Sequence, residues 1–383
     1  MKTEAEKQLA KLVSMPTISD DITANDMALD YIEGYITERG MHCQRHRYDG
    51  HGSLTASTRL TNAKTPTVLL AAHVDVMGGS EQMFTLRTVG DKLIGRGVYD
   101  MKFAIAGYLQ LVNELKGRLH DYDFGIMITT DEEYGGRDNI NSTPHLLKAG
   151  YRPKVCVVPD STAPGWNIEK IAKGAWRFDL IAKGRTAHGS RPWEGESASF
   201  KLIHALHELK AMFANHGPAT DTLNIGVIHG GETYNQIPSL MTASLEIRLV
   251  DETSYDRNVA LIQALCKKHD IGYKDRIATL PLNTDLSDPV VYSFMQSIEA
   301  VTGNIPDGVI SYGLSDAKYF SKAAVPCILS CPEGGGHHSE NEWISRKSFL
   351  QFVPILKDYL GKTARIRDPA ASKHLPAQEV ALL

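Results

Sequence analysis

Residues 68–75, Val-Leu-Leu-Ala-Ala-His-Val-Asp, decide the fold that this sequence predicts. The apolar run from Val68 to Ala72 is short enough for a strand that is buried on both faces. It ends directly in His73 and Asp75. Buried strands of this kind belong to parallel sheets, in which ligands bind beyond the carboxyl ends of the strands. The stretch therefore predicts an α/β sheet with a binding site at one edge.

The same pattern continues on both sides of this stretch. Amphipathic segments alternate with short apolar runs at 4–13, 25–38, 101–115, 124–128, 143–149 and 155–158. From about residue 174 polar and apolar residues alternate, and the predicted elements follow a βαββα order. The first pattern resumes near residue 290 and ends in an apolar run at 326–329. We therefore expect a doubly wound, mostly parallel sheet formed by residues 1–173 and 285–383, with an α+β, ferredoxin-like domain inserted at 174–284.

Charge and cysteine content narrow the class of protein. The 383 residues carry a formal net charge of -4, so neither nucleic acid nor an anionic membrane is an expected partner. Five cysteines without a C-x-x-C pair predict no disulfide framework. The N-terminal residues contain neither a signal peptide nor a membrane span, which favours a cytoplasmic protein. Residues 363–383 have no clear periodicity and are expected to form a loose tail.

Side chains that bind metal ions follow each predicted strand. His73 and Asp75 end the first run, and an acidic cluster, a further aspartate and a pair of histidines follow the later ones. Asp100 adds a carboxylate just before the helix at 101–115. The full set is His73, Asp75, Asp100, Asp131, Glu132, Glu133, Asp160, His337 and His338.

Each of these residues taken alone has a structural explanation. Asp100 would be a helix N-cap, and the acidic residues 131–133 would form a solvated turn. Together, however, the carboxylates would meet at one edge of one sheet, where like charges oppose each other's ionisation. No cluster of Lys or Arg is interleaved there apart from Lys102, whereas imidazole with carboxylate is a normal ligand set for zinc. A bound metal ion is the expected counter-charge.

The number of ligands predicts two metal ions. A catalytic zinc takes about three protein ligands, so five ligands serve two ions if one carboxylate bridges them. Asp100 is the expected bridge. Because Glu132 and Glu133 are adjacent, one can bind metal while the other accepts a proton from water. Asp75, two residues beyond His73, is expected to orient that imidazole.

Four motifs resemble the two-zinc aminoacylase and carboxypeptidase family, which includes acetylornithine deacetylase, succinyl-diaminopimelate desuccinylase, glutamate carboxypeptidase and several di- and tripeptidases. The motifs are A-H-V-D-V at 72–76, G-R-G-V-Y-D-M-K at 95–102, T-D-E-E at 130–133 and H-S-E-N-E at 338–342. They occur in the family's order and span nearly the whole chain.

The resemblance implies a role for each ligand. One metal would be held by Asp100, Glu133 and His338, and the other by Asp100, His73 and Asp160, with Glu132 as general base. The choice of His338 over His337 follows the family's H-x-x-N-E pattern. Zinc is the expected metal, although cobalt or manganese would suit the same ligands.

The resemblance also extends to the inserted domain. His188, in R-T-A-H-G-S-R-P at 185–192, is similar to a lid histidine that reaches the partner subunit's site, which implies a homodimer and a role in stabilising the oxyanion. Asn235, in N-Q-I-P, and Arg248 are similar to residues that grip the substrate. The alternatives are a satisfied loop histidine and a strand-surface charge.

These residues predict hydrolysis of the amide bond of a small peptide or an N-acyl amino acid by metal-activated water. The resemblance implies that peptidases acting on a free amino end tend to carry Asp at position 160 and deacylases Glu, so Asp160 tilts the prediction slightly toward a peptidase. A deacylase of the acetylornithine or succinyl-diaminopimelate type is the main alternative. A catalytically inactive metal-binding protein is another, which the intact Glu132 and full ligand set disfavour.

Overall fold

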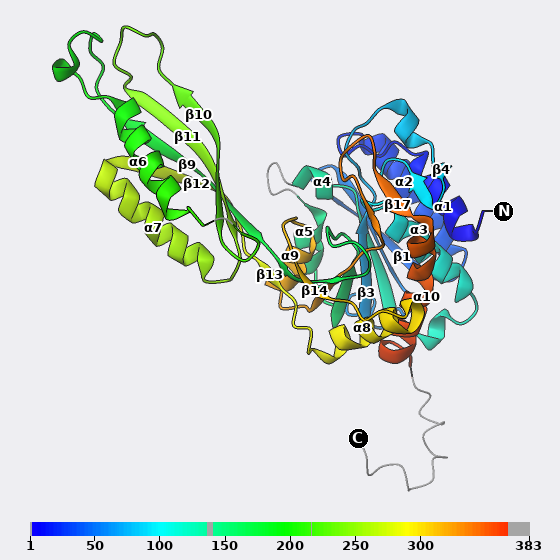
Figure 1. Cartoon of the computed structure of the whole chain (residues 1–383). Helices are drawn as coiled ribbons and strands as arrows, with labels where there is room; N and C mark the ends of the chain where they lie inside the picture. The colour runs from blue at the N-terminus through cyan, green and yellow to red at the C-terminus, as the bar shows by residue number, and fades with distance from the viewer. Residues whose placement is uncertain (1, 136–140, 216, 367–383) are drawn as a thin grey trace, which may run out of the picture. The chain divides into compact units, whose positions relative to one another are not determined.

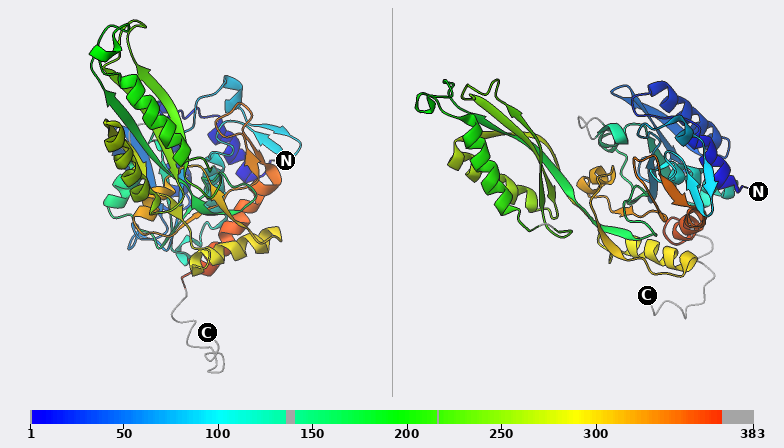
Figure 2. Two further views of the ribbon diagram at one scale, coloured as in Figure 1. Left: turned by 60° about the vertical axis from the view of Figure 1, so that its left-hand side comes forward. Right: turned by 45° about the horizontal axis from the view of Figure 1, so that its top comes forward.

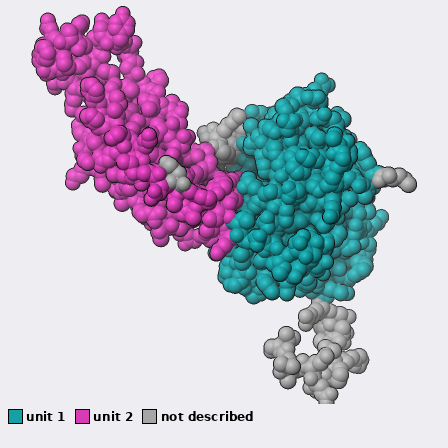
Figure 3. Space-filling model, in the orientation of Figure 1, with its two compact units in different colours: residues 1–169, 284–309, 315–383 teal, residues 170–283, 310–314 magenta. Residues whose placement is uncertain are grey.

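The structure is a computed structural model that describes residues 2–135, 141–215 and 217–366 (Figure 1). The chain divides into two compact units, which Figure 3 colours separately. Unit 1 comprises residues 1–169, 284–309 and 315–383, and unit 2 comprises 170–283 and 310–314. The predicted tail at 363–383 lies almost wholly outside the described residues.

Unit 1 is built on a six-stranded sheet, which confirms the expected mostly parallel α/β architecture. Its strands lie in the order β1 (His42–Tyr48), β2 (His51–Ser57), β6 (Phe124–Thr129), β3 (Val68–His73), β7 (Val155–Val158) and β15 (Cys327–Leu329). The four strands from β6 to β15 pair in parallel, and β2 runs antiparallel to both of its neighbours. Strand β3, which contains the opening stretch of the sequence analysis, is buried along its whole length.

Helices cover both faces of this sheet (Figure 1). On one face α3 packs against β3 and against α1, α2 and α10, and α10 also packs against α8; on the other face α5 and α9 pack against each other and against sheet strands. These helices are α1 (Glu4–Val13), α2 (Ile22–Thr37), α3 (Lys102–Glu114), α5 (Ser142–Lys148), α8 (Pro289–Thr302), α9 (Ala317–Lys322) and α10 (Arg346–Thr363).

A second sheet in unit 1 joins distant parts of the chain. Its order is β16 (Gly334–Gly335), β17 (Trp343–Ser345), β5 (Lys92–Ile94) and β4 (Arg87–Val89). Pairing of β17 with β5 brings the segment that carries His338 beside the segment that leads to Asp100. A third sheet, in the order β13 (Leu282–Asn283), β8 (Ile168–Ala172), β14 (Gly308–Ser311), lies where the chain passes between the units.

Unit 2 is a four-stranded antiparallel sheet with two helices on one face (Figure 2). Its elements follow the order β9 (Gly174–Lys183), α6 (Ala198–Met212), β10 (Thr222–Gly230), β11 (Leu240–Leu249), α7 (Ser254–His269) and β12 (Ile271–Thr279). This is a βαββαβ arrangement with the strand order β10-β11-β9-β12. Strand β12 is an addition to the βαββα pattern expected from the sequence.

Alternation along β9 explains why unit 2 has one covered face. Trp176, Phe178 and Leu180 are buried in the core of this unit, together with residues of α6 and α7. Arg177 and Asp179 therefore point to the opposite face, because successive side chains of a strand alternate. In neither unit does the described part of the chain contain a helix long and apolar enough to cross a membrane.

Candidate active site

The carboxyl ends of three adjacent parallel strands position the candidate site. Strand β3 ends at His73, and β6 and β7, which flank it, lead within a few residues to Glu132 and Asp160. Glu132 and Glu133 begin the short helix α4 (Glu132–Gly135). Because β6, β3 and β7 run in the same direction, these side chains emerge at the same edge of the sheet.

Six side chains form two groups that are each compact enough to hold a metal ion. One group is His73, Glu132 and Asp160, and the other is Asp100, Glu133 and His338; within each, the candidate ligand atoms lie within 4.8 Å of one another. All five ligands predicted from the sequence are thus brought together, and Glu132 joins them.

Asp100 lies between the two groups. Its Oδ1 is 3.1 Å from Nε2 of His73, and its Oδ2 is 3.1 Å from Nε2 of His338. His338 Nε2 is also 3.1 Å from a carboxylate oxygen of Glu133. Each oxygen of one carboxylate therefore faces a histidine of a different group, which is the arrangement that a bridging ligand needs.

The geometry and chemistry of these donors fit divalent metal ions. Two donors at about 2.1 Å from a tetrahedral zinc ion lie about 3.4 Å apart, close to the 3.1 Å separations around Asp100. Imidazole nitrogen with carboxylate oxygen is also the donor set that zinc, cobalt and manganese accept. The residues therefore fit two metal ions with Asp100 shared between them.

Electrostatics support the need for added positive charge. Burial raises the pKa of Asp160 and of Glu132, and the negative charges of Asp100 and Asp160, respectively, raise them further. Burial also raises the pKa of Glu133. At Asp100 burial acts in the same direction, but hydrogen bonds from His338 and His73 outweigh it and lower the pKa. Carboxylates at this density are costly to ionise without a cation between them.

Lys102 does not supply that positive charge. Its Nζ is fully buried and donates hydrogen bonds to the main-chain oxygens of Leu12 and Met15, at 3.1 and 2.7 Å. Burial lowers its pKa to about 7. The basic residue nearest to the candidate ligands in sequence is thus used to tie α3 to the end of α1.

Asp75 is buried beside His73 and contacts more than the imidazole. Nδ1 of His73 lies 2.9 Å from the main-chain oxygen of Asp75 and 3.5 Å from its carboxylate. The carboxylate also accepts hydrogen bonds from the backbone N–H groups of Glu132 and Glu133, at 3.3 and 3.0 Å, and from Ser19. It therefore holds the first turn of α4 as well as standing next to His73.

His337 lies outside both groups. Its ring packs edge-on against Tyr99, with 4.6 Å between the ring centroids. Burial lowers its pKa, as expected for an imidazole packed against an aromatic ring. His338, the next residue, is the one that faces Asp100 and Glu133.

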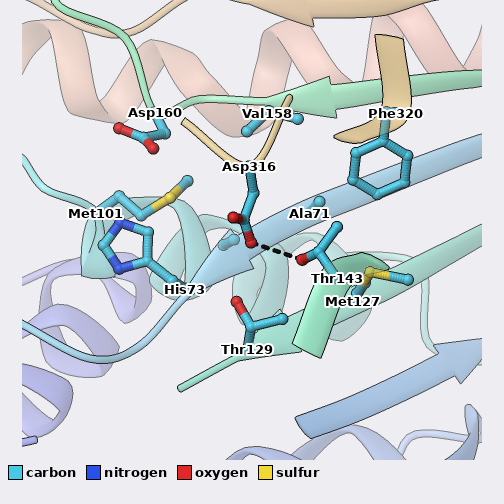
Figure 4. A pocket seen from close by; sticks show the side chains of 11 residues that line it. Ala71, His73, Met101, Met127, Thr129, Thr143, Val158, Asp160, Asp316 and Phe320 are labelled. Atoms are coloured by element: carbon cyan, nitrogen blue, oxygen red, sulfur yellow. Dashed lines mark hydrogen bonds between the residues drawn. The ribbon is translucent and has the colours of Figure 1, made fainter. Parts of the chain in front are cut away.

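Two buried carboxylates near the site were not assigned a metal-binding or catalytic role from the sequence. Asp316 accepts hydrogen bonds from Asn141 and Thr143, and with His73 and Asp160 it lines a cavity of about 10 Å³ (Figure 4). Glu342 is fully buried and accepts a hydrogen bond from the backbone N–H of Asp100. The final glutamate of H-S-E-N-E marked Glu342 in the sequence, but its contacts depend on pairing between distant segments.

The remaining predicted residues belong to unit 2. His188 and Asn235 are exposed and lie on neighbouring loops, joined by a hydrogen bond of 2.7 Å from the N–H of Gly189 to the carbonyl of Asn235. Nδ1 of His188 contacts the hydroxyl of Ser190 at 2.8 Å. The two loops are thus held to each other, and His188 is exposed.

Arg248 lies near the other end of β11 from Asn235. Its Nε donates to Glu246 at 2.8 Å, and Nη1 donates to the carbonyl of Tyr312 at 3.2 Å. Arg177 pairs with the same Glu246 carboxylate at 2.7 Å. The guanidinium of Arg248 is therefore held in place on the sheet face that α6 and α7 leave uncovered.

A mostly parallel α/β sheet with two adjoining histidine and carboxylate groups at its strand ends defines a class of metal-dependent hydrolases. Residues 69–362 match the family described as Peptidase family M20/M25/M40. The chain belongs to this family, and it is a hydrolase that acts on amide bonds.

Relatives of this chain in sequence include a desuccinylase and an aminoacylase. It is 26% identical over 359 residues to succinyl-diaminopimelate desuccinylase from Acidovorax ebreus (strain TPSY), which covers 87% of this chain and 91% of that one. It is 23% identical over 376 residues to aminoacylase-1 from Sus scrofa, covering 88% and 90%. Both relatives are named as deacylating enzymes.

Solved structures show the same fold. A tripeptidase from Staphylococcus aureus superposes with a TM-score of 0.79 at 17% identity, covering 94% of this chain and 98% of that one. Aminopeptidase PepT from Bacillus cereus gives a TM-score of 0.77 at 18% identity, with coverage of 94% and 98%. The fold is thus shared with peptidases, while the sequence relatives above are deacylases.

Proposed function

We propose that this chain is a two-metal hydrolase, using zinc, that cleaves the amide bond of small peptides carrying a free amino end. The observation that carries the proposal is the position of Asp100, whose two carboxylate oxygens each lie 3.1 Å from a histidine of a different ligand group. This arrangement supports one shared carboxylate and two ions.

We assign the ligands as follows. Asp100, Glu133 and His338 would hold one ion, and Asp100, His73 and Asp160 the other. Bound zinc lowers the pKa of coordinated water toward neutrality and polarises a carbonyl, which is the chemistry that amide hydrolysis needs. Asp75 keeps His73 and the first turn of α4 in position by accepting from two backbone N–H groups.

Glu132 would act as the general base and then the general acid. Its carboxylate stands within the group of His73 and Asp160, while its backbone is fixed by Asp75. From this position it would accept the proton of the attacking water and return it to the nitrogen of the leaving amine. Glu133, one residue on, is turned to His338 instead, which supports the division of roles between the two glutamates.

His188 would complete the site from a second copy of the chain. Unit 2 exposes large apolar side chains on α6 and on β10, which is an edge strand of its sheet: Phe200, Ile203, Val227 and Ile228. Exposed apolar surface beside an unpaired strand edge is suited to pairing with a second copy. In the homodimer we propose, His188 of one subunit donates a hydrogen bond to the developing oxyanion in the other subunit's site, and Asn235 and Arg248 contact the substrate.

The choice of peptide over N-acyl amino acid rests on Asp160. The family resemblance implies Asp at this position in peptidases that act on a free amino end and Glu in deacylases, and the names of two structural neighbours, a tripeptidase and an aminopeptidase, agree with a peptidase. The second candidate is an N-acyl amino acid deacylase, which the names of the relatives in sequence favour.

One experiment separates the two candidates. The protein, with its metal content measured on the same sample, is assayed on glycyl-leucine, N-acetyl-leucine and N-succinyl-leucine, which share the leaving amino acid and differ in the acyl side. We expect about two bound divalent ions per chain and the highest kcat/KM on glycyl-leucine. Faster cleavage of either N-acyl substrate would replace the peptidase by a deacylase. Two bound ions without hydrolysis of any amide would favour the inactive metal-binding protein.

A further inference from the structure

The backbone that carries Asp100 is held by one buried side chain, Glu342. Oε1 of Glu342 accepts hydrogen bonds from the N–H of Tyr99 at 2.9 Å and from the N–H of Asp100 at 3.1 Å. Oε2 accepts from the N–H of Gly97 at 3.0 Å. Three backbone donors within four residues thus converge on one carboxylate, which has no exposed surface.

The segment at 97–100 makes only local backbone hydrogen bonds besides these: the N–H of Val98 donates to the carbonyl of Gly95, and the carbonyl of Gly97 accepts from the N–H of Lys102. It precedes α3, whose N-cap residue is Met101 and has no side-chain capping bond, so Asp100 does not act as an N-cap. Gly97 has a φ of +81°, and a Cβ there would stand 2.7 Å from the Lys102 side chain, so the turn requires glycine. The Glu342 carboxylate satisfies three buried backbone N–H groups of the turn that precedes the helix.

The same carboxylate links this turn to both neighbouring ligand segments. Nη1 of Arg96 pairs with Oε2 of Glu342 at 2.8 Å, and Nη2 of Arg96 donates to the carbonyl of Gly78, in the loop that follows His73. Glu342 itself lies four residues after His338. The loop after His73 and the segment after His338 are therefore both joined to the Asp100 turn through the ion pair of Arg96 with Glu342.

We propose that Glu342 is a positioning residue for the shared ligand, and that it sets the Asp100 carboxylate in the orientation that lets each of its oxygens serve a different metal ion. The inference rests on the proposed two-metal function. A carboxylate that accepts three N–H bonds fixes the position and orientation of the peptide groups at 97–100. The side chain of Asp100 extends from this backbone, and its two oxygens each lie 3.1 Å from a histidine. Losing Glu342 frees the turn without removing any metal ligand.

Glu6 provides a matched control in the same unit. It is also buried, pairs with an arginine (Arg346, at 2.6 Å) and accepts from a backbone N–H (Thr3, at 2.7 Å), but it belongs to the start of α1 and touches no candidate ligand. Replacing either glutamate removes an ion pair with an arginine, although Arg96 is buried and Arg346 is partly exposed. Only replacing Glu342 changes the turn of Asp100.

The experiment compares the full chain with Glu342→Gln, Glu342→Asp and Glu6→Gln. Gln keeps the shape, but its amide N–H₂ replaces one of the two oxygens that accept hydrogen bonds from the backbone. Asp keeps the charge but is shorter by one methylene. Metal-free protein is titrated with Co²⁺ by calorimetry and by the visible absorption of the bound ion, and its melting temperature is measured without metal. kcat and KM are then determined on the best substrate.

We expect both Glu342 variants to bind at least one Co²⁺ about 10–100-fold more weakly than wild type, with an altered Co²⁺ spectrum and a lower kcat at little-changed KM. Glu6→Gln should lose thermal stability but keep wild-type Co²⁺ affinity and spectrum. Wild-type Co²⁺ affinity and spectrum in a folded Glu342 variant would overturn the inference, as would equal losses in Glu6→Gln. If Glu342→Gln does not fold, the Asp variant decides between these outcomes. Wild-type protein that binds no divalent ion would instead refute the proposed function, and the inference with it.

Discussion

The candidate residues of unit 1 and those of unit 2 are held in different ways. In unit 1 two of the acidic ligand segments are fixed by another buried carboxylate: Asp75 holds Glu132 and Glu133, and Glu342 holds Asp100. In unit 2, His188 and Asn235 are exposed and lie on loops that are joined mainly to each other. The first set forms a complete arrangement within its own unit. In the function we propose, the second set acts only when a second copy of the chain or a substrate covers it.

This difference predicts a ranking of effects. A residue fixed among buried charges contributes through the metal ions and the reacting water. Its loss should therefore lower the metal content or kcat strongly. An exposed loop residue contributes through contacts made on binding or assembly, so its loss should remove a part of the transition-state stabilisation. Substitutions in the two units therefore provide a direct test of the comparison.

The largest effect is expected for Asp100→Asn. It removes the charge shared by both ligand groups, so we expect fewer than two bound ions and a fall in kcat of roughly 10⁴-fold or more, since metal ions each contribute several kcal/mol to such reactions. Metal analysis and kinetics measure both effects. Asp123→Asn is the control, because Asp123 precedes the opposite end of β6, where it accepts hydrogen bonds from Thr67. A variant with two ions and near-normal turnover would refute the shared-ligand assignment.

Glu132→Gln should separate proton transfer from metal binding. We expect kcat to fall by roughly 10³-fold, because a positioned general base contributes about 10²–10⁴-fold. Because Glu132 is assigned as base, the variant should keep two bound ions and a similar KM. Loss of an ion would show that Glu132 is itself a ligand, as its place beside His73 and Asp160 also permits.

The strand-end ligands could be predicted from the sequence because each depends on a local pattern. A short apolar run predicts a buried strand, and the polar residue that follows it must emerge at the sheet edge, as His73, Glu132 and Asp160 do. The parallel core strands β3, β6 and β7 follow from the same pattern. Strands β1 and β2 were missed because the polar sequence of β1, His42–Tyr48, lacks an apolar run.

Contacts that depend on long-range pairing could not be predicted. Glu342 reaches Asp100 across 242 residues, and Asp75 reaches Glu132 across 57. Nothing within a local window distinguishes such a buried carboxylate from a solvated one. The hydrogen bonds of Lys102 could not be predicted for the same reason, because its partners, Leu12 and Met15, lie at the end of α1. The roles of His188, Asn235 and Arg248 stay predictions.

His188→Ala tests whether unit 2 contributes to catalysis. Removing one donor to an oxyanion costs about 10²–10³-fold in kcat, and we expect the lower end because His188 is exposed. Metal content should not change. His229→Ala, on β10 of the same unit, is the control.

Mixing the variants locates the partner of His188. Heterodimers of Glu132→Gln with His188→Ala contain one site with an intact Glu132 and an intact His188 from the other subunit. Activity should therefore rise above that of either variant alone. If the mixture, after subunit exchange verified by tagged chains, is no more active than its components, His188 acts within its own chain or not at all.

The smallest effect is expected for Arg248→Gln. A guanidinium fixed by Glu246 and Tyr312 is suited to bind a substrate carboxylate, so we expect KM for glycyl-leucine to rise about tenfold, the loss of one charge-assisted contact of about 1.4 kcal/mol. KM for glycyl-leucine amide, which lacks that carboxylate, should be nearly the same in variant and wild type. Arg276→Gln is the control, since Arg276 lies on β12 and is paired with Asp179. Equal increases in KM for both substrates would assign Arg248 to the stability of the sheet and leave the grip on the carboxylate to another group.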